Sequence, residues 1–234
     1  MSIYYKIKKI FDFPIPIFLK KNLKKYFGKN NLDQQIEEYL NFDNGFYIEL
    51  GAHDGISQSN TFYYEKKKNW KGILVEPTKH IFNKCKKHRS KKNFFYNCAC
   101  VSFAYEKKNL ELTYSGLKTF SEHLISDNQK IYQLSNPEIH FGEKNFSYIA
   151  EARTLNSLLD ESNAPNIIDF MSLDTEGSEF EVLNGIDFKN YNFKYMLIET
   201  NHFSKLDEYL SNKKYKFLKK FNYNDFLFKY DSII

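Results

Sequence analysis

Short apolar runs that alternate with longer amphipathic segments restrict the fold of this chain more than any other feature of its sequence. Each run has the length of a buried strand, and each longer segment has the length of a helix. The predicted strands are 45–50, 71–76, 93–102, 167–174 and 193–200. The predicted helices are 57–68, 78–88 (with Thr78 as N-cap), 153–161, 178–185 and 203–213. Strands joined by helices run parallel in one sheet, so the sequence predicts an α/β fold with a doubly wound, mostly parallel sheet.

Both ends of the chain depart from this alternation. Residues 214–221 and 223–230 have the pattern of two strands joined by a tight turn, and we expect a C-terminal hairpin that adds one antiparallel strand. Residues 33–41 have the pattern of a helix that leads into the domain. The chain therefore divides into residues 1–44, a basic arm with a leading helix, and residues 45–234, a single domain.

The basic character of the chain is concentrated in the arm. The net charge is +5, and residues 1–30 hold eight lysines against one aspartate, which is +7 and leaves −2 for the remainder. The lysines alternate with bulky apolar residues. Such a segment either lies on an anionic membrane surface or packs its apolar side on the domain with its lysines in solvent. The remainder carries no nucleic-acid recognition motif, so we expect no nucleic-acid partner.

No targeting or membrane-spanning segment is evident. No apolar run reaches the ~18 residues that a membrane-spanning helix needs. The stretch FPIPIFL is short, contains two prolines and precedes no small-residue cleavage site. The three cysteines form no CxxC pair and no zinc spacing, which favours free thiols. We therefore expect a cytoplasmic protein, membrane-peripheral only if residues 1–30 lie on lipid; no pattern indicates its oligomeric state.

The sequence YIELGAHDG, residues 47–55, places a glycine turn at the end of the first predicted strand. Ligands of open parallel sheets bind at the carboxyl ends of the strands, where Gly51 and Gly55 let the backbone turn tightly and approach a ligand. The turn lacks the GxGxxG spacing of a dinucleotide site. Glu49 beside it would repel a pyrophosphate, whereas a carboxylate suits a cationic ligand.

A second acid strengthens this interpretation. Glu76 ends the second strand 26 residues after Leu50, at the place where an acid accepts hydrogen bonds from ribose hydroxyls. Its alternative role is to cap the next helix. The glycine turn and this acid together predict a ligand that contains adenosine.

Acidic residues also end the later strands. Asp174 ends the strand 167–174, and Glu199 and His202 lie at the end of the strand 193–200, so all three belong to the same edge of the sheet. Glu176 and Glu179 open the helix that follows Asp174, where acids interact favourably with the helix dipole. We expect a structural role for these two and a role in the site for Asp174.

Residues 103–150 break the alternation of strands and helices. Residues 109–114 have the pattern of a short strand, but residues 115–147 are polar and lack clear periodicity. An irregular segment of about 30 residues in a compact domain is usually functional or disordered, and we predict a substrate lid inserted at 114–147. An ordinary surface excursion is the alternative. The candidate contacts to an acceptor are Tyr114, Ser115, His123 and His140, with Lys118 or Lys130 for an acceptor that carries phosphate.

Four stretches of the chain resemble the FkbM-type family of S-adenosylmethionine-dependent methyltransferases. They are YIELGAHDGISQSNTFYYEKKKNWKGILVEPTKHIF, RTLNSLLDE, MSLDTEGSEFEVLNG and MLIET, and they span about residues 45–200. The resemblance implies a class I, Rossmann-like fold, S-adenosylmethionine as cofactor and S-adenosylhomocysteine as product. It also implies O-methylation, often of hydroxyls on sugars, secondary metabolites or surface glycans. Residues 1–40 and 114–147 lie outside the resemblance.

The resemblance further implies roles for individual residues. His53 stands where the usual methyltransferase turn has its central glycine. The methionine part of the cofactor would be surrounded by Glu49, Gly51, His53, Asp54 and Gly55, with Ser59 and Asn60 completing this wall. The remaining cofactor contacts would be Glu76 to the ribose, Asn97, Cys98 and Ala99 near the adenine, and Asp174 close to the transferred methyl group.

Methyl transfer to a hydroxyl needs a general base, and we predict Asp174 or His202 in this role, with His53 shaping the pocket. Glu199 is expected to face the acceptor. These acids and His202 form no recognised metal signature, so we predict no metal. The predicted function is S-adenosylmethionine-dependent O-methylation of a sugar or modified sugar in a surface polysaccharide precursor, such as that of a capsule or lipopolysaccharide.

Two other functions are possible on the same fold. A nicotinamide or nucleotide-sugar enzyme is opposed by the absence of GxGxxG and by Glu49. A membrane-associated binding protein without methylating activity would use the basic arm as its functional part. The glycines of the turn, Glu76 and Asp174 oppose this second alternative, because a protein without a cofactor has no need of them.

Overall fold

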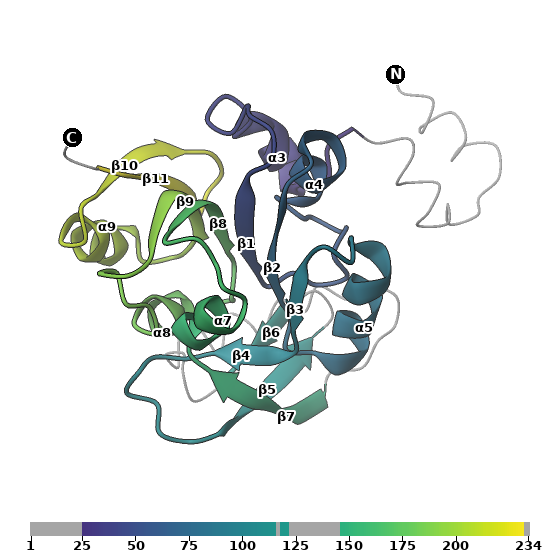
Figure 1. Cartoon of the computed structure of the whole chain (residues 1–234). Helices are drawn as coiled ribbons and strands as arrows, with labels where there is room; N and C mark the ends of the chain where they lie inside the picture. The colour runs from purple at the N-terminus through teal and green to yellow at the C-terminus, as the bar shows by residue number, and fades with distance from the viewer. Residues whose placement is uncertain (1–24, 116–117, 122–145, 232–234) are drawn as a thin grey trace.

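A seven-stranded sheet forms the centre of the protein (Figure 1). The computed structural model describes residues 25–115, 118–121 and 146–231. The strands of this main sheet are β1 (Phe46–Leu50), β2 (Lys71–Val75), β3 (Phe94–Tyr96), β8 (Ile167–Leu173), β9 (Asn192–Glu199), β10 (Tyr215–Lys220) and β11 (Asp225–Tyr230). Their order is β3-β2-β1-β8-β9-β11-β10, and β11 alone runs in the direction opposite to the other six strands. The predicted mostly parallel sheet with a C-terminal hairpin is confirmed.

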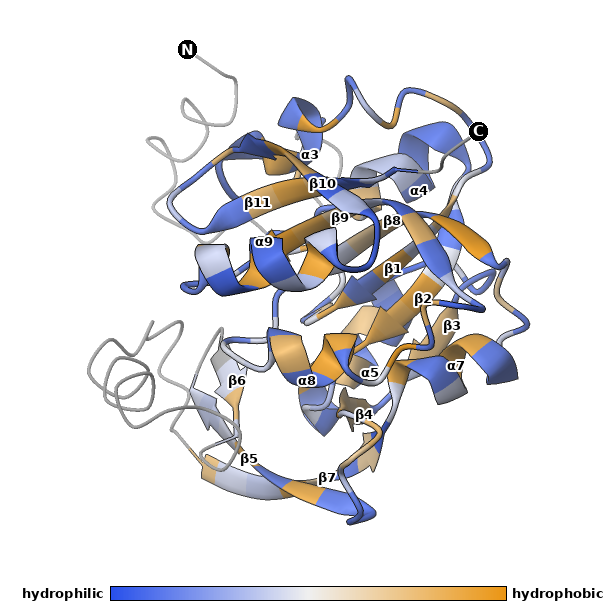
Figure 2. Ribbon diagram, turned by 90° about the vertical axis from the view of Figure 1, so that its left-hand side faces the viewer, coloured by the Kyte–Doolittle hydropathy of each residue, from blue (hydrophilic) through white to orange (hydrophobic). Residues whose placement is uncertain are grey.

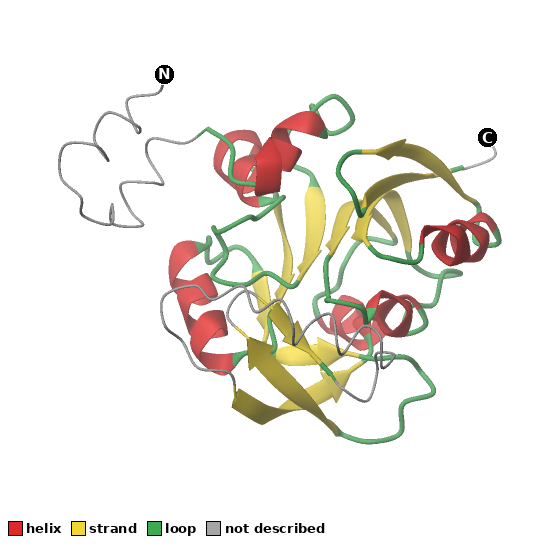
Figure 3. Ribbon diagram, turned by 180° about the vertical axis from the view of Figure 1, so that it is seen from behind, coloured by secondary structure: helices red, strands yellow, loops and turns green. Residues whose placement is uncertain are grey.

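Helices cover both faces of the main sheet (Figure 3). One face carries η1 (Lys29–Asn31), α3 (Leu32–Gln35), α4 (Phe62–Lys68) and α5 (Lys79–His88), and the other carries α7 (Leu155–Glu161), α8 (Glu179–Leu183) and α9 (Phe203–Ser211). Successive residues of a strand point to opposite faces. Accordingly, Tyr47 of β1 packs with the first group and Ile48 packs with the second. The fold is therefore doubly wound, as predicted.

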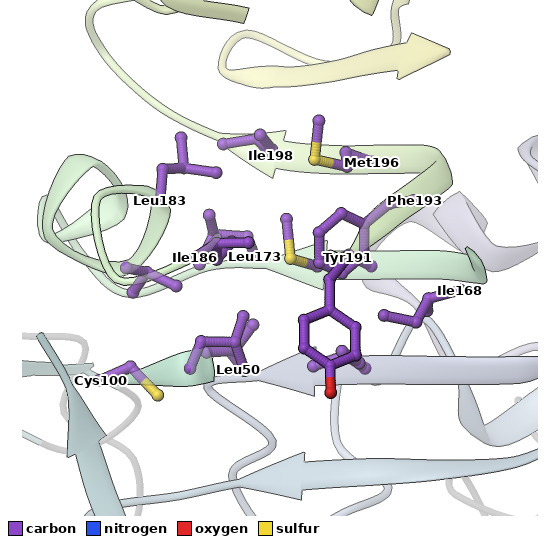
Figure 4. Packing of buried hydrophobic residues seen from close by; sticks show 14 of the residues in the cluster. Leu50, Cys100, Ile168, Leu173, Leu183, Ile186, Tyr191, Phe193, Met196 and Ile198 are labelled. Atoms are coloured by element: carbon purple, nitrogen blue, oxygen red, sulfur yellow. The ribbon is translucent and has the colours of Figure 1, made fainter. Parts of the chain in front are cut away.

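The larger core cluster lies between the main sheet and the helices α7, α8 and α9. Leu173, Met196 and Ile198 on neighbouring strands belong to it together with Leu183 of α8, and all four are at most 1% exposed (Figure 4). Burial of one such side chain contributes about 1.5–3 kcal/mol. This layer holds the carboxyl ends of β8 and β9 in a fixed relation, and the acids of the predicted site follow directly from those ends.

A second, four-stranded sheet lies beyond the carboxyl edge of the main sheet (Figure 2). It consists of β4 (Cys98–Cys100), β5 (Asn109–Ser115), β6 (Lys118–Phe120) and β7 (Phe146–Arg153) in the order β4-β7-β5-β6. The expectation of one continuous strand over 93–102 is wrong. The chain leaves the main sheet at Asn97, whose side-chain amide donates to the carbonyl oxygens of Glu76 and Pro77, and continues as β4.

The described parts of residues 103–150 are more regular than their sequence indicated. The short strand expected at 109–114 is present as β5, but β6 and β7 were not predicted. The residues of β7 alternate between apolar and polar except at Ile149, but only Ala150 is buried, and this short pattern was not recognised as a strand. His123, Lys130 and His140 lie outside the described residues, and of Lys118 only the backbone is described.

The described end of the basic arm packs on the domain. Phe27 is buried against Phe62 and Ile56, the Tyr26 hydroxyl donates to Glu37, and Gly28 forms a parallel bridge with Gln58. Residues 1–24 lie outside the described residues, so contact of the arm with a membrane stays a prediction. Within the described ranges, no helix combines the length and the apolar composition that crossing a bilayer requires.

Candidate active site

A cavity opens where the carboxyl ends of β1, β2 and β8 meet the second sheet. Its lining residues come from two places. Those from the main sheet and its loops are Leu50, Gly51, His53, Val75, Glu76, Pro77, Asp174, Thr175, Glu176 and Ser178; those from the second sheet are Cys98, Ala99, Cys100, Leu110, Leu112, Thr119 and Phe120. Six predicted cofactor residues are among them: Gly51, His53, Glu76, Cys98, Ala99 and Asp174.

The turn after β1 has the backbone conformation that its glycines indicated. Gly51, His53 and Gly55 have positive φ angles of 78°, 47° and 80°. A Cβ atom at Gly51 would collide with the carbonyl oxygen of Asp174. Glycine is therefore required at position 51 both for the left-handed backbone and for the close approach of two strand ends.

Glu76 connects this turn to the helix that follows β2. Its carboxylate is 5% exposed and accepts hydrogen bonds from the backbone N–H of His53 at 3.0 Å and of Thr78 at 2.7 Å. Burial raises the pKa of this carboxyl group, and these hydrogen bonds oppose the rise. The alternative role foreseen for Glu76 is thus present, because it accepts a hydrogen bond at the start of α5. Glu76 also lines the cavity, and its contact with a ribose stays a prediction.

Thr78 stands at the N-cap of α5, as predicted, but its side chain makes no capping bond. The hydroxyl instead pairs with the hydroxyl groups of Thr119 at 3.0 Å and of Tyr148 at 2.9 Å. These contacts attach the second sheet to the start of α5. Thr119 in turn lines the cavity, so the sheet is held over it by polar as well as apolar contacts.

Glu49 does not line the cavity. Its buried carboxylate accepts hydrogen bonds from the Ser59 hydroxyl, the Asn60 N–H, the Thr61 hydroxyl at 2.6 Å and the Arg89 guanidinium at 3.0 Å. These bonds also explain why the helix predicted at 57–68 begins only at Phe62, since the chain before it is shaped around Glu49. Ser59 and Asn60 bond to Glu49 and do not line the cavity.

Arg89 is the main site-forming residue that the sequence analysis missed. Its side chain is fully buried, and it donates to Glu65 at 2.7 Å, to the Tyr47 hydroxyl at 2.6 Å, to the Thr61 hydroxyl at 2.8 Å and to the Gly55 carbonyl at 3.1 Å, besides Glu49. The sequence signal that could have indicated this role is the residue type, arginine. The chain has 34 basic residues, of which only two are arginine, and a buried fork of donors is a task that lysine performs poorly.

Asp54 closes the glycine turn. It accepts hydrogen bonds from the backbone N–H of Ile56 and from both the N–H and the hydroxyl of Ser57. Burial favours the neutral acid, but the neighbouring His53 and these donors hold the pKa of Asp54 well below its usual value. Asp54 and Gly55 therefore build the turn and do not themselves line the cavity.

His53 lines the cavity from this turn. Its Nδ1 atom is buried and has no hydrogen-bond partner within the described part of the chain. The nearest carboxylate oxygen, Oδ1 of Asp54, is 3.8 Å away, which is too long for a hydrogen bond. His53 thus lines the cavity and carries a buried nitrogen without a hydrogen bond, and its contact with the cofactor stays a prediction.

Asp174 and Glu199 form a pair of carboxyl groups at the ends of β8 and β9. A hydrogen bond joins their side chains. Burial raises the pKa of Asp174 well above its usual value, and the charges of Glu199, Glu176 and Glu179 raise it further. Two carboxyl groups can share a hydrogen bond only if one of them is protonated, so this contact and the raised pKa both favour a shared proton.

Glu179 lies beside this pair but has a structural role, as predicted. One of its oxygens accepts hydrogen bonds from the N–H of Gly177 at 2.9 Å and from the Thr175 hydroxyl at 3.2 Å. Burial raises its pKa to about 7, against these bonds. Glu176 differs from the expectation: it precedes the helix, has a positive φ of 55° and lines the cavity.

The second sheet supplies an apolar wall that the sequence analysis did not assign to the site. Leu110 and Leu112 of β5 and Phe120 of β6 line the cavity together with Cys98 and Ala99. The alternation in NLELTY indicated which residues of β5 share a face. It did not show where that face lies, because β5 pairs with β7 and β6 and not with the main sheet.

Three predicted contacts to the acceptor, Tyr114, Ser115 and Glu199, are not among the residues that line the cavity. Tyr114 and Ser115 are buried and do not line the cavity; the Tyr114 ring packs on His80 and Phe146. His202 is exposed at the start of α9.

In the part of the chain that the structure describes, no three His, Cys, Asp or Glu side chains are grouped so that they could hold a metal ion.

The chain matches the model of the methyltransferase FkbM domain over residues 49–224, and no curated protein matches it. The solved structures similar to it include M. capricolum TrmK in complex with S-adenosylhomocysteine (11% identity, TM-score 0.38, covering 85% of this chain and 66% of that one). Two structures of the METTL16 methyltransferase domain are 12% identical, with TM-scores of 0.45 and 0.41, and cover 97% and 85% of this chain and 77% and 65% of theirs. Structural similarity at these identities and TM-scores supports no conclusion about function. The match over residues 49–224 is decisive, and the chain belongs to the FkbM family of methyltransferases, whose methyl donor is S-adenosylmethionine.

Proposed function

We propose that the protein is an O-methyltransferase that acts on a sugar or modified-sugar hydroxyl of a surface polysaccharide precursor. The observation that carries O-methylation is the pair of Asp174, which lines the cavity, and its neighbour Glu199. A hydroxyl group must lose its proton as it attacks, and a carboxylate with a raised pKa is suited to accept that proton. A neutral amine has no such need before it attacks.

The residues around the cavity fit S-adenosylmethionine. The cradle at Gly51 admits no side chain, His53 offers an unpaired nitrogen, and Glu76 presents a carboxylate. Gly51 and His53 would hold the methionine part, and Glu76 would hold the ribose hydroxyls. The apolar residues that would enclose the adenine are Ala99, Leu110, Leu112 and Phe120.

The bound cofactor supplies an electrophilic methyl group on a positively charged sulfur. The protein's own contribution is to position the acceptor and to take its proton. Asp174 would accept the hydroxyl proton, and Glu199 would share it through the hydrogen bond that already joins the two side chains. The exposed side chain of His202 is less suited to this task, because the described structure places it outside the cavity.

The nature of the acceptor is supported by the family alone. FkbM-type enzymes often methylate sugar hydroxyls, and the sequence resemblance extends that expectation to this chain. A glycan precursor and a cytoplasmic reaction remain parts of the proposal. The arm at residues 1–30 would bring the protein to a membrane surface where such precursors are assembled.

Mass spectrometry with trideuteromethyl-labelled S-adenosylmethionine tests the proposal. Purified protein would be incubated with a panel of nucleotide sugars, lipid-linked sugars and, as amine controls, amino sugars. We expect a mass gain of one labelled methyl group on a hydroxyl-bearing acceptor, lost in Asp174→Asn. Labelling of amino groups only, or labelling that Asp174→Asn leaves unchanged, would refute the O-methyl assignment with this base.

A further inference from the structure

The cavity has a marked imbalance of charge. Three acidic residues line it, Glu76, Asp174 and Glu176, and among the described lining residues only His53 can carry a positive charge. Arg89 does not correct the imbalance, because its guanidinium is taken up by Glu49 and Glu65. The cavity therefore favours a cation over a neutral ligand of the same shape.

Within this acidic surrounding, the register of β8 with β9 places Asp174 beside Glu199, and two carboxyl groups so close together favour sharing one proton. The pair lies at the ends of two strands that are in register up to Leu173 and Ile198. An ionised carboxylate only accepts hydrogen bonds, so their hydrogen bond exists because one of the two is neutral. The register of the two strands keeps the two residues next to each other.

The charges around the pair determine how strongly the shared proton is held. The other titratable groups in its surroundings are Glu176 and Glu179 after β8, Asp225 on β11, Glu76 after β2, His53 and Asp54 after β1, and His202 after β9. Most of them are acids, and they hold the proton on the pair. A positive charge brought into the cavity acts in the opposite direction.

We propose that binding of the cationic methyl donor expels the proton shared by Asp174 and Glu199, whereas the product, which lacks the sulfonium charge, leaves that proton in place. The proton passes to the buffer, and only one O–H bond is broken. The pair thus becomes a doubly ionised base only when the donor is bound. The inference rests on the proposed position of the cofactor and is independent of the acceptor.

Two measurable consequences follow. Release of one proton on binding makes the affinity for the donor rise by about tenfold per pH unit while the pair is protonated in the free protein. The affinity for the product, which has no sulfonium charge, should change little over the same range. The ratio of the two affinities should therefore shift towards the donor as the pH rises, which assists release of the product.

Isothermal titration calorimetry in phosphate and in Tris measures the number of protons released, because the two buffers differ in their heats of ionisation. The ligands would be S-adenosylmethionine, S-adenosylhomocysteine and sinefungin, an unreactive analogue with an ammonium group in place of the methylsulfonium. We expect S-adenosylmethionine and sinefungin to release about one proton more than S-adenosylhomocysteine between about pH 6 and 8.

Glu199→Gln removes the shared proton but keeps a donor for Asp174, and Asp174→Asn provides a second variant should the first not fold. Glu161→Gln, which changes the charge equally at an exposed site paired with Arg153, is the matched control. We expect the difference in proton release to disappear in the first two and to persist in the control. Equal release by donor and product, or a difference that survives both changes at the pair, would overturn the inference alone. No binding of any of the three compounds would overturn the cofactor placement and the inference with it.

Discussion

Replacing Arg89 with methionine should destabilise the fold by about 3–5 kcal/mol, because it leaves two buried carboxylates without their cation. Glu49 and Glu65 each lie within 3.0 Å of the guanidinium, and the hydroxyl groups of Tyr47 and Thr61 lose a donor as well. Methionine keeps much of the length and the apolar contacts of the side chain, so the loss measures the charge and its hydrogen bonds.

Lysine at position 89 should cause a smaller loss. It keeps the positive charge, but one ammonium group cannot reach acceptors that lie on both sides of a planar guanidinium. Each buried partner left without a donor costs about 1–3 kcal/mol, so we expect a loss of at least about 2 kcal/mol. The chain provides a matched control in Arg153, whose side chain is 22% exposed and paired with the exposed Glu161. Arg153→Met should cost less than about 1 kcal/mol.

Urea denaturation followed by circular dichroism gives the free energy of unfolding for each variant, at pH 7 and at lower pH. Burial alone would raise the pKa of Glu65, but Arg89 and the donors around it hold that pKa below its usual value. Glu65 therefore stabilises the folded protein above its pKa in the unfolded chain, about 4.3. This stabilisation is lost as the pH falls through the pKa of Glu65 in the folded protein. The difference between native protein and Arg89→Met should shrink in acid. An Arg89→Met variant within about 1 kcal/mol of the native protein at pH 7 would refute this account of the network.

Three further changes test other parts of the site. Gly51→Ala should abolish binding of S-adenosylmethionine in calorimetry, since its Cβ would collide with the Asp174 carbonyl; unchanged affinity would show that the turn is not the cofactor cradle. Leu112→Ala removes an apolar side chain that lines the cavity and should weaken binding of S-adenosylmethionine by about tenfold. Tyr114→Ala, on the same face of β5 but outside the cavity, should not weaken it. Equal effects of the two changes would contradict the assignment of Leu112 to the cavity wall. Asp54→Asn should flatten the loss of stability in acid, because its depressed pKa supplies stability above about pH 4 that is lost as the pH falls; an unchanged acid profile would count against the hydrogen bonds assigned to Asp54.

The main sheet could be predicted from the sequence because its signal is local. Apolar runs of strand length, each ending in an acid or a glycine turn, are enough to place Glu76, Asp174 and Glu199 on one edge of the sheet. The same reasoning failed at Asn97, where an apolar stretch continues but the chain changes sheets. The cause is a contact between distant segments, the Asn97 amide with the carbonyls after β2, and periodicity does not record such a contact.

Glu49 shows a second limit of the same kind. Its position beside the turn was predicted correctly, but its orientation depends on Arg89, which is 40 residues away in the sequence. Strand periodicity places Ile48 and Leu50 on the opposite face to Glu49, towards the helices α7 to α9. It does not reveal that the carboxylate there meets a cation. The rarity of arginine in a lysine-rich chain was the only sequence signal for that partner.

The acids at the strand ends fall into two groups that differ in the hydrogen-bond partners of their carboxyl oxygens. Glu49, Asp54 and Glu76 are bonded by backbone N–H groups, hydroxyls or a guanidinium, and these donors fix the loops. In Asp54 they help to hold the pKa below its usual value, and in Glu76 they oppose the rise in pKa that burial causes. Asp174 has another carboxyl group, Glu199, as its hydrogen-bond partner, which raises its pKa instead. An acid held ionised by several donors is a weak base, because the donors compete with any proton it could accept. An acid whose partner is a second acid keeps a raised proton affinity, and this contrast is the physical reason for assigning proton transfer to the pair.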